Sequence, residues 1–262
     1  MSKDLPRISV IIPSYNKADY IGATIKSIID QKYPNLEVII QDGGSKDGTV
    51  EIIKKFAKKY PIITWISKKD NGQVDAINTG LRKASGLIVT YINADDVYKK
   101  GALFEVGSYF LKHPKTLWLT GFGDIIDNKG KINHQLITEY KNILLRVNSL
   151  QILLMVNYIT QAATFLSKRA YLKFGSFTGT RKYVMEYEMW LKLGSVKMPA
   201  VLKNELASFR LTKDNISATA FKELLSIDNN IAREFTNNSL ILILHRLHNL
   251  LRIGIVSLSK VT

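Results

Sequence analysis

Two adjacent carboxylates, Asp95 and Asp96, follow a strongly apolar segment and are the first candidates for chemistry in this sequence. The segment Leu87–Ile92 is typical of a strand that is covered on both faces of a sheet. In an open α/β sheet, ligands bind in the crevice beyond the carboxyl ends of the strands. Asp95, alone or with Asp96, could hold Mg²⁺ or Mn²⁺ there, and the cation could hold a diphosphate. Alternatively, both residues form a turn and cap the next helix.

A second acidic turn, Gln41–Thr49, follows the apolar segment Leu36–Ile40. Its glycines would let backbone amides approach a ligand closely, and the Asp42 carboxylate can accept hydrogen bonds from a base or a ribose. A helix that begins at Thr49 would direct its N-terminal amides at the same crevice. The alternative is an ordinary strand–turn–helix junction capped by Asp47 or Thr49.

These turns belong to an ordered series of segments that also includes Val10–Asn16, Asp70–Gly80 and Met185–Leu193. The series resembles the family-2 glycosyltransferases, which have the GT-A nucleotide-sugar fold, across residues 6 to about 215. Each segment is weak alone, and their order and spacing carry the resemblance. The resemblance implies transfer of a sugar from a nucleotide-diphosphate sugar to an acceptor hydroxyl with inversion.

The resemblance also implies a nucleotide site built from several of these segments. The residues expected to line it are Pro13, Tyr15, Asn16, Asp42, Asp75, Asn78 and Asp95. Asp95 and Asp96 are the expected ligands of the Mg²⁺ or Mn²⁺ cofactor. For the segment that contains Asp75 and Asn78, helix capping by Asp70 or Asn71 is the alternative.

The candidate catalytic base lies in Met185–Leu193. Sugar transfer with inversion needs a carboxylate that accepts the proton of the acceptor hydroxyl. Glu186 falls on the position that the family usually fills with aspartate. Glu188, two residues later, is the second candidate and would point to a different side of the helix. Both are also explained as acidic residues that favour a helix N-terminus.

Three further residues have weaker assignments. Gln161 is expected to face the acceptor or to be a polar residue of an edge strand. Trp190 is expected to form a wall of the acceptor site or to belong to the core. Arg210 is expected to pair with a diphosphate or to form a surface ion pair. Thr212 stands where relatives often have histidine, so a histidine ligand is missing at that position.

Length and composition predict one large α/β domain with a C-terminal helical extension. We expect a catalytic domain over residues 1–215 and an extension over 216–262. Within the domain, residues from about 6 to 112 form the nucleotide-sugar half and about 113–215 the acceptor half. The 262 residues are 46% hydrophobic, enough for a sizeable core, and include no cysteine, which excludes disulfides and zinc-thiolate sites.

The first half alternates strands and helices, which predicts a mainly parallel sheet flanked by helices. The expected strands are Ile8–Ile12, Leu36–Ile40, Ile62–Ile66 and Leu87–Ile92, and the expected helices are Ala18–Asp30, Thr49–Tyr60 and Gln73–Lys83. After a helix over Gly101–Leu111 the pattern is mixed. Strands are expected at Leu117–Ile126 and Gln161–Ser167, and a helix or bent segment at Leu144–Tyr158.

The charge is strongly basic, with 37 Lys and Arg against 22 Asp and Glu, a net charge of +15. A basic balance suits phosphorylated substrates or anionic lipid. Nucleic acid is not expected, because aromatic residues do not interleave with the basic clusters. The N-terminus is too short and polar for a signal peptide and no stretch reaches the length of a membrane span, so we expect a cytoplasmic protein.

The C-terminal stretch Leu240–Leu258 is apolar but interrupted by basic and polar residues. It predicts an interfacial helix that contacts an anionic membrane peripherally, near a glycan or lipid-linked acceptor of surface polysaccharide assembly. The alternative is a helix packed on the domain or on a second subunit, as in a homodimer.

Two rival functions remain open from the sequence. A sugar nucleotidyltransferase also places acids near a nucleotide, but it would need a Gly-rich loop with a basic residue after the first strand, where Pro13–Asn16 stands instead. A non-catalytic basic binding protein on the same fold is the other rival, and glutamate at position 186 in place of the usual aspartate leaves it open.

Overall fold

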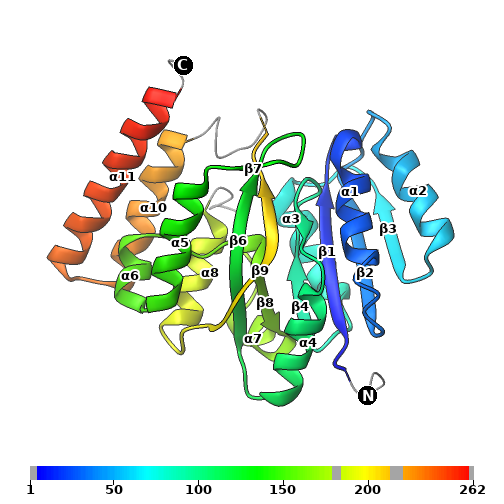
Figure 1. Ribbon diagram of the computed structural model, residues 1–262, viewed down its shortest axis with the longest axis horizontal. Coiled ribbons are helices and arrows are strands. Elements are labelled where there is room, and N and C mark those ends of the chain that lie inside the picture. Colours follow the sequence, from blue (N-terminus) through cyan, green and yellow to red (C-terminus); the bar gives the residue numbers. More distant parts are fainter. Residues whose placement is uncertain (1–4, 179–183, 213–220, 260–262) are drawn as a thin grey trace.

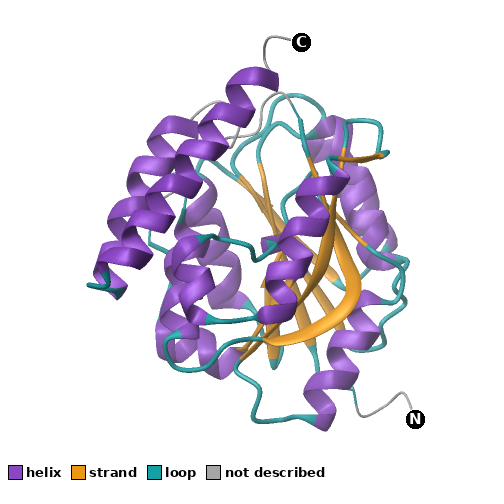
Figure 2. Ribbon diagram, turned by 60° about the vertical axis from the view of Figure 1, so that its left-hand side comes forward, coloured by secondary structure: helices purple, strands orange, loops and turns teal. Residues whose placement is uncertain are grey.

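The computed structural model describes residues 5–178, 184–212 and 221–259, and of residues 221–224 and 253–259 it describes the backbone only. Within this part of the chain, nine strands form one twisted sheet that lies between two sets of helices (Figures 1 and 2). The strand order is β3-β2-β1-β4-β8-β6-β9-β5, and β7 pairs with β6.

The first half alternates parallel strands with helices, as the sequence predicts. Its elements are β1 (Ile8–Ser14), α1 (Ala18–Ile29), β2 (Leu36–Asp42), α2 (Thr49–Lys59), β3 (Ile63–Ser67), α3 (Gln73–Lys83) and β4 (Ile88–Tyr91). β1 is buried at every position, because it lies between two parallel neighbours and under helices on both faces. Ser14 pairs with Asp42 and Ile11 with Tyr91, so the carboxyl ends of β1, β2 and β4 meet at one edge of the sheet.

The second half mixes strand directions. Its elements are β5 (Val97–Tyr98), α4 (Ala102–Lys112), β6 (Trp118–Ile126), β7 (Ile132–Asn133), α5 (Gln135–Val147), α6 (Leu150–Met155), η1 (Gln161–Ala163), β8 (Thr164–Ser167), α7 (Lys168–Phe174), α8 (Met185–Gly194), β9 (Ala200–Arg210), α10 (Phe221–Phe235) and α11 (Ser239–Ser259). β8 is antiparallel to β4 and β6, and β6 is parallel to β9. The expected α/β fold with a mainly parallel sheet is confirmed.

The segment Leu144–Tyr158 is bent, the second of its two expected forms: the end of α5 is followed by α6, because Asn148 adopts a left-handed φ of 49° and the Ser149 side chain caps α6. Two expected boundaries were wrong. The segment Gln161–Ser167 starts as a 3₁₀ turn and becomes a strand only at residue 164. Leu87 precedes β4 and is 66% exposed, so it does not belong to the buried run.

The packing of α3 on β1 depends on Gly80. A Cβ atom at Gly80 would lie 2.5 Å from Cγ2 of Ile11, whereas at Gly22 in α1 the nearest atom would be 3.7 Å away. We expect Gly80→Ala to lower the free energy of unfolding by about 1–3 kcal/mol, the usual cost of overpacking. Gly22→Ala should raise it by about 0.5–1 kcal/mol through helix propensity. Denaturant unfolding of both variants is the test, and equal effects would contradict this account of the α3–β1 contact.

The C-terminal helices α10 and α11 lie side by side at one edge of the molecule (Figures 1 and 2). On the inner face of α11, His245 is buried and its Nδ1 lies 2.7 Å from the carbonyl oxygen of Leu154 in α6. The Tyr187 hydroxyl of α8 donates to the same carbonyl at 3.1 Å. This carbonyl therefore ties α11, α6 and α8 together, and the inner face of α11 packs on the domain. In the described part of the chain, no helix combines the length and apolar character needed to cross a bilayer.

Candidate functional site

The carboxyl end of β4 leads directly into the acidic turn. The Asp95 carboxylate lies here and pairs with Lys17, whose Nζ is 2.7 Å from Oδ2 of Asp95. Lys17 follows β1 and precedes α1, so its position at the same edge of the sheet follows from the parallel order of β1 and β4. Both side chains are largely buried, with 9% of Asp95 and 24% of Lys17 exposed. The turn thus presents one carboxylate beside one ammonium group.

Asp96 points into the protein. Its Oδ1 accepts a hydrogen bond from the backbone N–H of Arg210 at 2.8 Å, and its Oδ2 accepts one from Nδ2 of Asn93 at 3.2 Å. Burial and the neighbouring charge of Asp95 raise the pKa of Asp96 well above its usual range. Because both carboxylate oxygens serve the protein, the position of Asp96 favours support of the turn over direct contact with a cation.

Arg210, at the end of β9, connects the acidic turn with the turn after β6. Its Nε donates to the carbonyl oxygen of Asp95 at 2.7 Å, and its Nη1 donates to that of Asp127 at 3.0 Å. The guanidinium also stacks 5.4 Å from the ring centroid of Tyr20. These contacts favour a positioning role, and the expected pairing with a diphosphate stays a prediction.

The donor set at this turn can serve one kind of metal. No group of three or more metal-ligating side chains occurs in the part of the chain that the structure describes. Mg²⁺ in particular is often bound through one or two carboxylates together with substrate phosphates. Asp95 can provide such a carboxylate, for which the Lys17 ammonium and the cation would compete. The residues therefore fit a divalent cation that a nucleotide diphosphate would help to hold.

The start of α8 brings Glu186 to the end of β4. The Tyr91 hydroxyl donates a hydrogen bond to Oε1 of Glu186, although the two residues lie 95 positions apart in the sequence. Burial raises the pKa of Glu186 above the ordinary value of 4.5. Burial, Glu186 and also the charge of Asp96 raise the pKa of Tyr91, so the base candidate and the acidic turn share one electrostatic environment. A carboxyl with a raised pKa at the carboxyl end of a strand suits proton acceptance.

Glu188 has a different environment from Glu186. Its Oε1 lies 2.7 Å from Nζ of Lys192, one turn further along α8. The residue is 7% exposed. The two glutamates thus point to different sides of the helix, as their spacing predicts, and Glu186 is the one that the structure places at Tyr91.

A cleft of about 550 Å³ opens beyond the carboxyl ends of β2 and β3. Its lining includes Asp42, Lys68, Asp70, Asn71, Asp75 and Arg82. The cleft is large enough for a small ligand and combines three carboxylates with basic side chains. It brings together Asp42 and Asp75, two residues expected at the nucleotide.

Within this cleft, Asp42 shapes the turn after β2. Its Oδ2 accepts hydrogen bonds from the N–H groups of Gly44 and Ser45 at 3.1 and 2.9 Å, and from the Ser67 hydroxyl at 2.6 Å. Asp75 accepts from the N–H of Asn71 at 3.2 Å. The expected contact of Asp42 with a base or ribose stays a prediction.

The other expected nucleotide residues lie around the same edge. Tyr15 is 62% exposed at the end of β1. Asn16 adopts a left-handed φ of 49°, and its Oδ1 accepts from the N–H of Lys46 at 3.1 Å, which joins the first two turns. Pro13 is buried within β1. Asn78 lies apart from them, because it makes two hydrogen bonds with the backbone of Phe177 at 2.9 and 3.0 Å.

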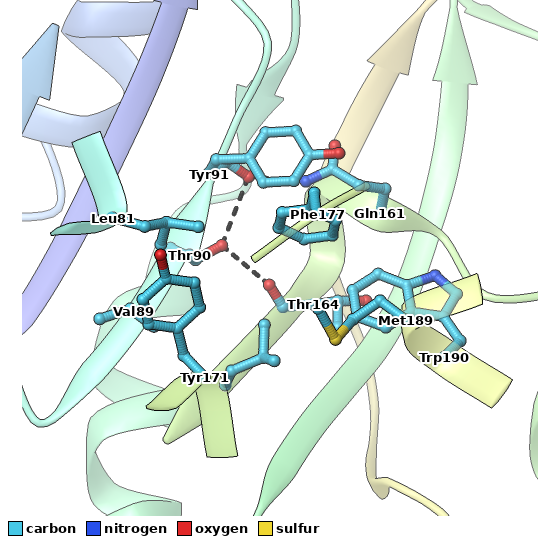
Figure 3. Close-up of a pocket in the computed structure, with 11 residues that line it drawn as sticks. Leu81, Val89, Thr90, Tyr91, Gln161, Thr164, Tyr171, Phe177, Met189 and Trp190 are labelled. Atoms are coloured by element: carbon cyan, nitrogen blue, oxygen red, sulfur yellow. Dashed lines mark hydrogen bonds between the residues drawn. The ribbon is translucent and has the colours of Figure 1, made fainter. Parts of the chain in front are cut away.

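Gln161 and Trp190 line, together with Tyr91, a small void in a closely packed interior, with Gln161 beside the Tyr91 ring (Figure 3). Nε2 of Gln161 donates to the Tyr91 carbonyl at 2.7 Å. Trp190 is 1% exposed and stacks on Trp118 with ring centroids 5.3 Å apart. The void that they help to line measures only about 10 Å³. These positions favour the core alternative for Trp190 and a supporting role for Gln161.

Sequence reasoning missed Lys17 and Tyr91. Lys17 directly follows the named segment Val10–Asn16, so a basic residue after one strand and acids after a neighbouring parallel strand were an available signal. Tyr91 is the last residue of a buried strand and carries a polar group that needs a partner. Its pairing with Glu186 depends on how α8 folds back and had no local signal.

The parallel sheet with its acidic turn and crevice defines an α/β protein of the GT-A type. The model of the family "Glycosyl transferase family 2" matches residues 9–179, and the chain belongs to that family. Family membership favours a glycosyltransferase over the nucleotidyltransferase that the sequence left open.

Proteins with detectable sequence similarity to this chain are named as glycosyltransferases. An uncharacterized glycosyltransferase of Haemophilus influenzae is 29% identical over 238 residues, covering 88% of this chain and 74% of its own length. A putative teichuronic acid biosynthesis glycosyltransferase of Bacillus subtilis is 36% identical over 118 residues, covering 45% of this chain and 47% of its own. The chain thus spans about half of that relative.

Among solved structures, a mannosyltransferase from Pyrobaculum calidifontis in complex with GDP-Man and Mn²⁺ superposes with a TM-score of 0.72 at 19% identity. The match covers 98% of this chain and 74% of that one. At this identity the likeness shows a shared fold.

Proposed function

We propose that this protein transfers a hexose-type sugar from a nucleotide-diphosphate sugar to an acceptor hydroxyl with inversion. The observation that carries the proposal is the Glu186 carboxyl, which accepts a hydrogen bond from Tyr91 at the carboxyl end of β4, beside the turn that holds Asp95. A base and a diphosphate-binding carboxylate on one sheet edge are what a direct displacement at a sugar carbon needs.

The donor would lie along this edge. The cleft with Asp42 and Asp75 would take the nucleoside, and its lining residues Lys68, Lys69 and Arg82 would attract the negative charge of the nucleotide. The diphosphate would then reach Asp95. A bound Mg²⁺ or Mn²⁺ would neutralise charge that develops on the leaving diphosphate. Lys17 places a second cation at the same carboxylate.

Glu186 would accept the proton of the acceptor hydroxyl. The acceptor oxygen then attacks the anomeric carbon while the bond between that carbon and the diphosphate breaks. The proton therefore ends on Glu186 and the electron pair on the leaving nucleotide. The Tyr91 hydroxyl holds one oxygen of Glu186 and orients the other. Asp96 and Arg210 keep the acidic turn in place through their mutual hydrogen bond.

We further propose a cytoplasmic role in the assembly of a surface polysaccharide or lipid-linked glycan, with peripheral contact to an anionic membrane. The Bacillus relative is named for teichuronic acid biosynthesis, and the Pyrobaculum mannosyltransferase was solved with GDP-Man and Mn²⁺. These names support a nucleotide-sugar donor, a divalent metal and a glycan acceptor. Residues 1–215 would form the catalytic domain, and the extension 216–262 lies partly outside the described residues.

A thermal-shift screen of nucleotide sugars with and without Mn²⁺ tests the donor. A ligand that binds only the native state stabilises it by about 2.7 kcal/mol at a concentration of 100 Kd. We expect UDP- or GDP-sugars to raise Tm, and Mn²⁺ to enlarge the rise. The free metal and the free sugar are the controls. No shift with any nucleotide sugar, in the presence of metal, would contradict the proposed donor class.

A further inference from the structure

Helices α5 and α11 carry exposed apolar side chains that cover no part of the core. On α11, Leu240, Ile243, Leu247, Leu250 and Leu251 are each at least 51% exposed. Their spacing places them on one stripe of the helix. The opposite stripe contains His245 and Asn249, which are buried against the domain. The helix therefore packs on the domain with one face and leaves its apolar outer face exposed to a further contact.

The apolar stripe of α5 adjoins that of α11. On α5, Leu136 is 83% exposed, Ile143 56% and Val147 59%. The ring of Tyr140 on α5 stacks on His248 of α11 with centroids 6.1 Å apart, so the two helices are in contact there. We call these exposed apolar residues of α5 and α11, with Tyr140, the α5–α11 face. Large continuous apolar surfaces of this kind mark contacts with proteins or membranes.

The charges around the α5–α11 face are predominantly basic. Arg246 is exposed on α11 and lies one turn from Ile243 and Leu250, which places it at the margin of the stripe. The exposed Lys129 and Lys131 shortly precede α5 and outnumber the neighbouring Asp127 carboxylate. Between Gln135 and Val147 the single acid is Glu139, and from Ser239 to Arg252 there is none. An apolar stripe with basic margins is the pattern of a helix that lies in a membrane interface.

This charge distribution favours a membrane over a second copy of the chain. A two-fold contact pairs a surface with itself, so it would bring the basic margins of two copies together. Anionic headgroups instead neutralise Arg246 and Lys131 while the leucines enter the acyl boundary. We propose that the α5–α11 face docks the protein on an anionic membrane surface, with both helices in the interface.

Docking on this face would also orient the site for the proposed transfer reaction. This orientation has a role only under the proposed function, whereas the docking itself does not depend on that function. In Figure 1 α11 runs toward the end of the molecule at which β1 terminates, and β7, which directly precedes α5, lies at that end. The docked face therefore extends to the side of the molecule that contains the carboxyl ends of the strands. A hydroxyl on a lipid-linked acceptor would approach the crevice from the bilayer surface.

Sedimentation with vesicles tests the docking face. The full chain should bind vesicles of phosphatidylcholine and phosphatidylglycerol, and bind less at high salt or to phosphatidylcholine alone. The double variant Leu247→Ser/Leu251→Ser should lower the partition coefficient by about tenfold or more, since each exposed leucine loses its apolar burial. The matched control is Leu87→Ser/Leu172→Ser, whose leucines are 66% and 69% exposed on other parts of the surface.

The basic margin is tested in the same assay. Arg246→Glu/Lys131→Glu should lower binding to anionic vesicles at least fivefold for each site, about the effect of one basic residue near such a surface. Lys58→Glu/Lys112→Glu, on the exposed sides of α2 and α4, is the charge-matched control and should lower it much less. Donor-induced thermal shifts should persist in all variants, which separates a failure of docking from a failure of the proposed transferase.

Two results would overturn the proposal. One is that the full chain ignores anionic vesicles, or that the control variants lose binding as much as the face variants do. The other is that the protein is a dimer by light scattering and that Leu247→Ser/Leu251→Ser makes it a monomer without changing vesicle binding, which would assign the α5–α11 face to a second copy.

Discussion

Replacing Glu186 with glutamine is expected to lower turnover by roughly 10²–10⁴-fold, the usual contribution of a general base. Glutamine keeps the size of the side chain and can still accept the hydrogen bond from Tyr91, but it cannot accept a proton at neutral pH. Donor binding should persist, because Glu186 lies at the acceptor side of the proposed reaction. Single-turnover transfer and donor binding by thermal shift measure the two effects separately.

The pH dependence should carry the same signature. Burial raises the pKa of Glu186, so the carboxylate needed for catalysis accumulates only above the ordinary value of 4.5. We expect activity to rise with pH through this raised pKa, and the rise to be absent from the residual activity of Glu186→Gln. Stability should move in the opposite direction. A folded pKa above the unfolded one means that stability present at low pH is lost as pH rises through the folded pKa.

Glutamine at position 186 does not ionise, so the variant should gain stability relative to the natural protein as pH rises through the same window. The matched control is Glu188→Gln, which removes the partner of Lys192 and leaves the contact with Tyr91 intact. If Glu188→Gln is the inactive variant and Glu186→Gln retains turnover, the base has been assigned to the wrong glutamate.

The parallel half of the fold was predictable because its signals are local. Leu36–Ile40 is an apolar segment interrupted only by Glu37 and followed by a polar turn, and the helix after it begins at Thr49, as the sequence indicates. The second half, with its mixed strand directions, lacks such signals. β5 and β7 are two residues long, and the ladder between β6 and β9 shifts register at Gly121 and Phe122. Such irregular pairing depends on tertiary contacts that no short window of sequence contains.

The candidate site likewise combines residues that have local sequence signals with residues that do not. Asp95 and Glu186 could be proposed from the sequence because each lies in a recognisable segment. The partners that give them their environment come from distant positions: Lys17 is 78 residues from Asp95, and Tyr91 is 95 residues from Glu186. Asp96 shows the converse limit. The sequence offers it as a possible second ligand beside Asp95, but the backbone N–H of Arg210, 114 residues away, already occupies one of its oxygens.

Replacing Asp95 with asparagine should abolish the gain in donor binding that Mn²⁺ or Mg²⁺ provides, and lower turnover by roughly 10²–10³-fold. A cation that stabilises charge on the leaving group contributes several kcal/mol, and about 1.4 kcal/mol is one factor of ten. Asparagine retains one carbonyl oxygen but loses the negative charge that attracts the cation. Titration of Mn²⁺ in the presence of a nucleoside diphosphate measures the loss directly.

The ion pair with Lys17 supplies the control that separates two roles of Asp95. If Asp95 acts through a metal, Lys17→Met should leave the dependence on Mn²⁺ intact or increase the affinity for the cation, because the carboxylate loses a competing positive charge. If Asp95 serves only to orient the Lys17 ammonium, the two substitutions should have the same effect and EDTA should change neither binding nor transfer. That pair of results would remove the metal from the proposed reaction and assign the neutralisation of the diphosphate to Lys17.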